Sequence, residues 1–146
     1  MKKAIICDLD GTLALFEGNP YDRDFSKDEI NYPVLRIIET MADVYCGYDV
    51  IESKLYDIIV LSGRNDKYKK ETKKWLKKYE VPYSKLFMRK EGDKRKDTVV
   101  KKEIFDNYIK GKYNVLCAID DRKQMKRLWV SEGIFVLDVN QTDEEF

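Results

Sequence analysis

The stretch Asp8-Leu9-Asp10-Gly11-Thr12 follows directly on the apolar run from Ala4 to Cys7. A short apolar run that ends in a turn signal predicts a buried strand, and ligands of open α/β sheets bind just beyond the carboxyl ends of strands. The two aspartates therefore stand where chemistry is usually done. Because Gly11 allows a sharp turn, one carboxylate can act as a nucleophile and the other as a proton carrier. An ordinary Asp-x-Asp-Gly turn is the alternative interpretation.

The chain has 146 residues, and residues 1–146 are expected to form one domain that buries its core without disulfide bonds. Its cysteines, Cys7, Cys46 and Cys117, are expected to be reduced, small core residues, as is typical of the cytoplasm. There is no run of 18 apolar residues, and Asp8 interrupts the apolar opening too early for a signal peptide. We expect a soluble cytoplasmic protein that has no membrane partner.

The net charge of the chain is +1, but the charges are unevenly placed. Residues 1–62 carry 6 Lys or Arg against 12 Asp or Glu, a net −6, whereas residues 63–146 carry 22 against 15, a net +7. A basic half is a weak indication of a polyanionic partner. The chain has no histidine, so proton transfer near neutral pH would fall to carboxylates, Lys, Tyr, Cys or metal-bound water.

Strand and helix patterns alternate along the rest of the chain. The period of the apolar residues predicts strands over residues 3–7, 57–61, 85–88, 114–119 and 134–137. Helices are predicted over about residues 33–45, 66–79, 97–109 and 125–129. Gly47 is the expected stop of the first helix, residues 16–26 are expected to form a loop or small flap, and residues 48–56 stay unassigned. The expected inner stripe of the third helix consists of Val99, Val100, Phe105, Tyr108 and Ile109. This alternation predicts an α/β fold with a doubly wound, five-stranded parallel sheet.

Three of the expected strands end in polar side chains, which are Asp8 and Asp10, Ser62 and Arg64, and Asp120 and Asp121. Since the carboxyl ends of parallel strands lie at one edge of a sheet, these groups should meet there. Four carboxylates would repel one another unless a hard cation lay between them, and Mg²⁺ prefers such oxygen ligands. Ser62 and Lys96 would donate to phosphate oxygens. A helix cap is the alternative interpretation of the second aspartate pair.

In this order the motifs resemble the haloacid dehalogenase-like (HAD) phosphohydrolase superfamily over nearly the whole chain. Asp8 to Thr12 resembles the first motif, Ser62 the second, Lys96 the third and Asp120-Asp121 the fourth. A narrower resemblance, to the 3′-phosphatase half of phage polynucleotide kinase/phosphatase, rests on residues 19–22, 61–64, 89–97 and 118–122. The G-x-x-x-x-G-K-[ST] loop of a kinase does not occur in this sequence.

The HAD resemblance implies a Mg²⁺-dependent phosphomonoester hydrolase that works through an aspartyl-phosphate. Asp8 would attack phosphorus, and Asp10 would protonate the leaving oxygen and later take a proton from water. Ser62 and Lys96 would hold the phosphate. The implied metal ligands are Asp8, the carbonyl of Asp10, Asp120, and Asp121 either directly or through water.

The narrower resemblance implies a substrate, the 3′-phosphate end of a DNA or RNA strand. It adds Arg64 and Asp93 to the substrate site, where Thr12 and Gly63 of the first two motifs are also expected. This subset is expected to carry an arginine before its Pro-Tyr-Asp sequence. Here the preceding residues are Glu17-Gly18-Asn19, and the nearest candidate is Arg23.

The spacing of the motifs leaves no room for a large cap domain, because about 50 residues separate the first two motifs and 34 separate Ser62 from Lys96. An open site suits the end of a polymer. The lysines of the second expected helix form either a solvated face or a nucleic-acid contact; they are Lys67, Lys69, Lys70, Lys73, Lys74, Lys77 and Lys78. A small-molecule phosphatase such as a nucleotidase and a noncatalytic binding module are the alternative functions.

Overall fold

A parallel five-stranded sheet forms the centre of the protein, in a computed structural model that describes residues 1–20, 22–46, 49–53 and 55–144. The strand order is β7-β6-β1-β8-β9, and every neighbouring pair is parallel. The strands are β1 (Lys2–Asp8), β6 (Asp57–Asn65), β7 (Lys85–Arg89), β8 (Tyr113–Asp120) and β9 (Phe135–Asp138). The predicted doubly wound α/β fold is confirmed.

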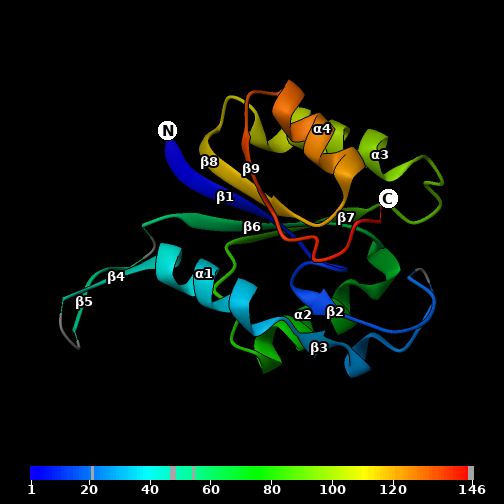
Figure 1. The fold of residues 1–146 in the computed structure, drawn as a ribbon, viewed down its shortest axis with the longest axis horizontal. Coiled ribbons are helices and arrows are strands. Elements are labelled where there is room, and N and C mark those ends of the chain that lie inside the picture. The colour runs from blue at the N-terminus through cyan, green and yellow to red at the C-terminus, as the bar shows by residue number, and fades with distance from the viewer. Residues whose placement is uncertain (21, 47–48, 54, 145–146) are drawn as a thin grey trace.

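Helices cover both faces of this sheet (Figure 1), which are α1 (Tyr32–Ala42) and α2 (Lys69–Lys78) on one face and α3 (Asp97–Ile104) and α4 (Lys123–Ser131) on the other. Successive side chains of a strand point to opposite faces, so β1 supplies Ile5 and Cys7 to one core cluster and Ala4 and Ile6 to the other. The central strand is therefore buried on both sides, and its carboxyl end leads straight into the first motif.

Short elements surround the carboxyl edge of the sheet. The expected flap begins with β2 (Ala14–Leu15), which pairs antiparallel with β3 (Glu29–Ile30), and the 3₁₀ turn η1 (Phe25–Lys27) lies between them. A second turn, η2 (Asp66–Tyr68), connects β6 to α2. None of the described helices has the length and apolar character needed to cross a membrane. Cys7 and Cys117 are buried free thiols, whereas the side chain of Cys46 lies outside the described residues.

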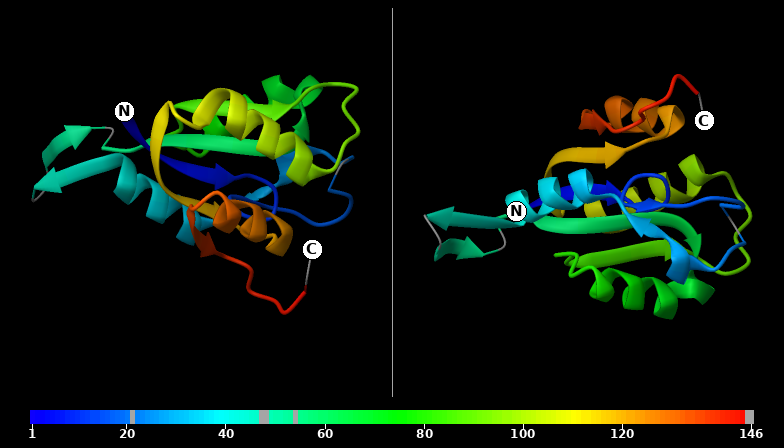
Figure 2. Two further views of the ribbon diagram at one scale, coloured as in Figure 1. Left: turned by 90° about the horizontal axis from the view of Figure 1, so that it is seen from above. Right: turned by 60° about the horizontal axis from the view of Figure 1, so that its bottom comes forward.

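The first helix is shorter than the sequence predicts. It ends at Ala42, and β4 (Asp43–Cys46) and β5 (Asp49–Ser53) follow as an antiparallel hairpin. The hairpin extends from the body at the end opposite the loops around the first motif (Figure 2). The helical prediction to Tyr45 was wrong because β-branched and aromatic residues here gain strand partners from β5. The expected stop at Gly47 lies outside the described residues.

The third helix changes its pitch, which corrects part of its predicted inner stripe. Residues 105–109 continue α3 as a π-helical turn, η3 (Phe105–Ile109), so Ile109 is buried as predicted, together with Val100 and Phe105, whereas Tyr108 turns outward. Tyr108 is consequently 52% exposed, and Val99, which lies before this turn, is 46% exposed. The inner face of α3 also carries a buried lysine, Lys101, which contacts Asp8 at the end of β1.

Candidate active site

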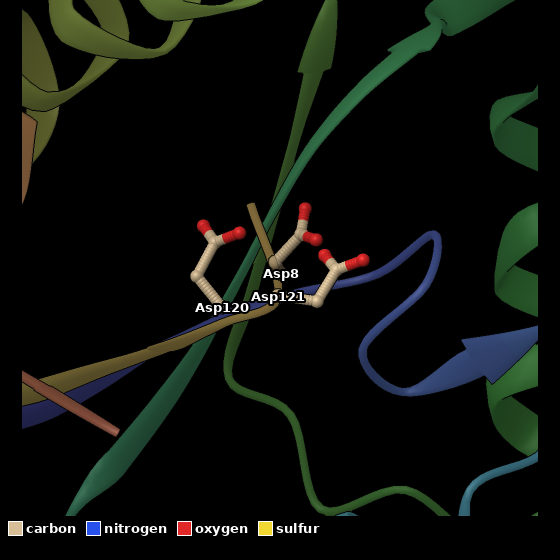
Figure 3. A group of neighbouring side chains, drawn as sticks. All are labelled: Asp8, Asp120 and Asp121. Atoms are coloured by element: carbon tan, nitrogen blue, oxygen red, sulfur yellow. The ribbon is translucent and has the colours of Figure 1, made fainter. Parts of the chain in front are cut away.

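Three buried carboxylates meet where β1 and β8 end. Asp8 is the last residue of β1, Asp120 is the last residue of the neighbouring β8, and Asp121 follows it. One oxygen of each lies within 4.8 Å of the others, and Figure 3 shows the three side chains directed at the same space. We call Asp8, Asp120 and Asp121 the acidic cluster.

A single lysine contacts the acidic cluster among the described residues. Nζ of Lys101 donates to Oδ1 of Asp8 at 2.7 Å, and the lysine side chain is only 1% exposed. Burial alone would lower the pKa of Lys101, but the charges of Asp8 and Asp120 outweigh it and raise that pKa. The lysine is therefore charged at every physiological pH, and it holds one oxygen of Asp8 in place.

The acidic cluster carries more negative charge than its surroundings balance. Burial, and then the charge of Asp8, raise the pKa of both Asp120 and Asp121 above the ordinary aspartate range. Oγ1 of Thr12 lies 3.0 Å from Asp8 Oδ2 and 3.1 Å from Asp121 Oδ1, yet a hydroxyl has one proton to donate. Three carboxylate oxygens in this excess of charge fit the requirements of Mg²⁺.

Gly11 makes room for the acidic cluster. Its φ is +83°, which favours glycine, and a Cβ built on it would collide with the carboxylate of Asp121. The glycine of the first motif is thus required by the approach of the fourth motif, 110 residues later in the chain.

The carboxylate of Asp10 does not join the acidic cluster. Its Oδ1 accepts 2.6 Å hydrogen bonds from Nη2 of both Arg23 and Arg64. The same two arginines contact Oδ2 of the buried Asp28, at 2.7 and 3.4 Å. We call Asp10, Asp28, Arg23 and Arg64 the arginine cluster. The expectation that four side-chain carboxylates converge is corrected, since three converge and the fourth is paired with arginines.

The aromatic ring of Phe25 packs against both guanidinium groups of the arginine cluster. The guanidinium carbon of Arg64 lies 3.8 Å from the centroid of the buried Phe25, and that of Arg23 lies 4.5 Å from it. Nη1 of Arg64 also donates to Oγ1 of Thr72 at 2.9 Å. These contacts hold both guanidinium groups beside Asp10. Arg23, the nearest candidate for the arginine expected before Pro20, thus contacts Asp10.

The second motif forms a tight turn at the end of β6. Oγ of the buried Ser62 accepts the backbone N–H of Arg64 at 3.0 Å, which leaves the hydroxyl proton free to donate. A Cβ on Gly63 would collide with the carboxylate of Asp97. Asp97 is itself held by Arg89 and Arg122, each at 2.8 Å. The first residue of α3 therefore packs against the turn of the second motif.

The lysine that contacts Asp8 is Lys101, five residues after the Lys96 expected for the third motif. Lys96 is exposed and makes no side-chain hydrogen bond or ion pair within the described chain, whereas Lys101 contacts Asp8. Asp93 binds Arg95 at 2.7 Å, and these hydrogen bonds lower the pKa of Asp93 to about 2. The sequence did contain a signal for Lys101. Residue 101 lies four positions from both Asp97 and Phe105, so it falls on the inner face of the helix, where an unpaired lysine is rare.

A pocket of about 890 Å³ opens over these groups. Asp8, Asp10, Gly63, Arg64, Asp121 and Lys101 line it, and Asp93 and Lys96 stand in its wall. Thr12 is fully buried beneath the pocket, and Arg23 reaches Asp10 from outside its lining. Seven of the sequence-predicted residues therefore line this pocket, whereas Thr12, Arg23, Ser62 and Asp120 lie outside its lining.

In this doubly wound sheet, Asp8 and Asp120 end β1 and β8, and Lys101 of α3 pairs with Asp8. This arrangement is that of a phosphatase of the HAD type. The chain belongs to the family of polynucleotide kinase PNKP phosphatase domains, which matches residues 2–144. This membership supports a phosphatase over the noncatalytic binding module.

Relatives of the chain occur in nucleic-acid repair proteins. The chain is 36% identical over 131 residues to a protein of Autographa californica nuclear polyhedrosis virus that is provisionally named a bifunctional polynucleotide kinase/RNA ligase, covering 87% of this chain and 18% of that protein. Two structures of the Pnkp1/Rnl/Hen1 complex, one titled an RNA repair complex, each contain a similar chain at 39% identity. Their TM-scores are 0.85 and 0.86, with 98% and 99% of this chain covered and 44% and 48% of theirs. The chain thus spans less than half the length of these relatives.

Proposed function

We propose that this domain removes 3′-phosphates from polynucleotide ends in a Mg²⁺-dependent reaction that passes through an aspartyl-phosphate on Asp8. The contact between Lys101 and Asp8 carries this proposal, because it orients a buried carboxylate at the floor of an open pocket. Family membership supports the polynucleotide, and the RNA ligase and RNA repair names of the relatives favour an RNA end. Buried free Cys7 and Cys117 support a cytoplasmic location, and residues 1–146 would act as one domain.

The nucleophile would be Asp8, whose two oxygens have different partners. Lys101 binds Oδ1 and Thr12 approaches Oδ2, so the carboxylate is held at one angle to the pocket. A bond forms between Asp8 and phosphorus as the bond from phosphorus to the ribose oxygen breaks. Water then attacks the phosphorus, which releases inorganic phosphate and restores Asp8.

The proton carrier would be Asp10, which gives a proton to the leaving ribose oxygen and later takes one from the attacking water. Arg23 and Arg64 hold its carboxylate at 2.6 Å and place positive charge beside the phosphoryl group. The free proton of Ser62 can be donated to a phosphoryl oxygen. The two carboxylates of the first motif thereby take separate roles because their partners differ.

The acidic cluster would hold Mg²⁺, with the carbonyl of Asp10 as a further ligand. When bound, the ion supplies positive charge that stabilises the phosphoryl oxygens in the transition state.

Phosphate release from matched substrates tests this function. We expect an oligonucleotide with a 3′-phosphate to be hydrolysed with Mg²⁺ and to be stable in excess chelator, while the same oligonucleotide with a 5′-phosphate reacts far more slowly. Equal rates on both ends would contradict the 3′ assignment. Faster turnover of free mononucleotides would favour a nucleotidase, and full turnover in chelator would contradict the metal site.

A further inference from the structure

The pocket contains more positive charge than the transferred phosphate needs. Five of its cationic side chains bind acidic residues of the protein; they are Arg64, Arg89, Arg95, Lys101 and Arg122. The other three, Lys67, Lys94 and Lys96, have no acidic partner among the described residues. Three uncompensated lysines in one pocket are suited to an anion other than the one that reacts at Asp8.

Aromatic residues line another part of the same pocket. The ring of Phe16 has the guanidinium group of Arg23 at 3.7 Å behind it, and the ring of Tyr68 packs edge-on against Phe25 at 4.8 Å. Arg23 thus supports the ring of Phe16, Phe25 supports the ring of Tyr68, and Nζ of Lys67 lies 5.0 Å from the Tyr68 centroid, while both rings line the pocket. Nucleobases stack on such rings regardless of their sequence.

The aromatic rings and two of the three lysines come from opposite layers of the fold, whereas Lys67 precedes Tyr68 in η2. Phe16 follows β2 and Tyr68 precedes α2, on the side of α1 and α2, whereas Lys94 and Lys96 lie on the loop that leads into α3. Figure 2 shows both loops at the same end of the molecule. A volume of about 890 Å³ is near the upper end of the range for ligand pockets and far exceeds the size of one phosphoryl group.

We propose that the pocket holds the last nucleotide of the strand together with the phosphodiester that precedes it. The terminal base lies against Phe16 and Tyr68, and Lys94 and Lys96, assisted by Lys67, bind the preceding phosphate. The smallest good substrate is then a dinucleotide that carries a 3′-phosphate. This inference rests on the proposed function and adds the residues by which the site selects a polymer end.

A length series tests the number of nucleotides that the pocket holds. For the unaltered protein, we expect kcat/KM to rise about 10-fold or more from a 3′-mononucleotide to a dinucleotide 3′-phosphate. From the dinucleotide to a decanucleotide it should rise less than about 3-fold, because no further pocket residue remains to be occupied. A continued rise with length would overturn the inference and favour the lysine face of α2, and a flat series would overturn it as well. Absence of any 3′-phosphate hydrolysis would instead contradict the proposed function.

Paired lysine variants test which surface binds the preceding phosphate. Lys94→Gln with Lys96→Gln should raise KM for the dinucleotide about 10-fold with little change in kcat, and should flatten the salt dependence by roughly 0.7 in log–log slope for each lost contact. The matched control is Lys77→Gln with Lys78→Gln, which removes the same charge from exposed residues at the far end of α2. Equal effects from both pairs would overturn the assignment, since only general charge would then matter.

An abasic substrate separates stacking from support of the arginine cluster. Phe16→Leu should reduce kcat/KM for the normal dinucleotide by about 10-fold and leave the rate for a dinucleotide that lacks its terminal base almost unchanged. Equal losses on both substrates would show that Phe16 acts only through Arg23, and the base site would be wrong.

Discussion

Two groups of carboxylates lie at the carboxyl edge of this sheet, and they differ in how their charge is balanced. In the acidic cluster, Asp8, Asp120 and Asp121 lie together, and one lysine, Lys101, pairs with Asp8. The arginine cluster places two carboxylates against two arginines, with distances as short as 2.6 Å. Because an unbalanced buried charge is costly, the first group would gain more from a cation in solution than the second. The deficit of positive charge, rather than the number of acids, therefore indicates where Mg²⁺ would bind.

Removing one carboxylate from each cluster should give the largest difference in turnover between the two clusters. Asp8→Asn should abolish turnover, because the nucleophile itself is lost. Asp10→Asn should lower kcat by roughly 10² to 10⁴-fold, because proton transfer is lost while the nucleophile remains. Single-turnover kinetics measure both rates. In addition, beryllofluoride should bind at Asp8 as a mimic of the aspartyl-phosphate. Normal turnover by Asp8→Asn would point to direct attack by water.

Removing the one cation of the acidic cluster should have the next largest effect. Lys101→Gln should lower kcat by about 10² to 10³-fold, because a charged donor to the nucleophile is lost from a buried site. Lys102→Gln is the matched control, since that neighbouring lysine pairs with Asp106 and Glu132 instead. Turnover by both variants should be compared at saturating Mg²⁺. Equal rates would contradict the assigned role of Lys101.

Unbalancing the arginine cluster should cost stability as well as rate. Asp28→Asn leaves two buried guanidinium groups with one carboxylate, so the free energy of unfolding should fall by about 3 kcal/mol and kcat by roughly 10-fold. Urea denaturation measures the first effect. Glu29→Gln, an exposed neighbour, serves as the control. An unchanged unfolding free energy would show that the two arginines do not depend on Asp28.

The smallest expected effect is a pH dependence that belongs to the acidic cluster alone. The pKa values of Asp120 and Asp121 are raised, so the folded protein binds more protons than the unfolded chain above about pH 4. Without metal, this contribution to stability should be lost as the pH rises toward those raised values, by at most about 1.4 kcal/mol per pH unit for each group. Thermal unfolding from pH 5 to 8 should show this loss, and Asp120→Asn should weaken it.

Mg²⁺ should reverse this loss, since it stabilises the folded state by about 2.7 kcal/mol at 100 times its dissociation constant. The metal should have much less effect on the Asp120→Asn variant. A metal-free protein that gains stability between pH 5 and 8 would contradict the charge deficit of the cluster.

The sequence by itself determined the sheet, the order of its strands along the chain and the aspartates at their ends. These features depend on local periodicity and on the rule that parallel strands place their carboxyl ends together, so Asp8, Asp120 and Asp121 could be predicted to meet. The hairpin of β4 and β5 could not, because the same residues also continue the helical period of α1.

Only the tertiary structure decided how the charges pair. Lys101 and Asp8 are 93 positions apart, and Arg64 and Asp10 are 54 positions apart, so neither pair leaves a local pattern. Lys96 and Lys101 are both lysines near the start of one helix, and the packing of α3 against the sheet buries Lys101 while Lys96 stays in solvent. Likewise, Asp10 stands two residues from Asp8, but the turn at Gly11 and the approach of Arg23 and Arg64 separate their partners. Charge pairing follows distance in space and burial, and these quantities exist only in the folded chain.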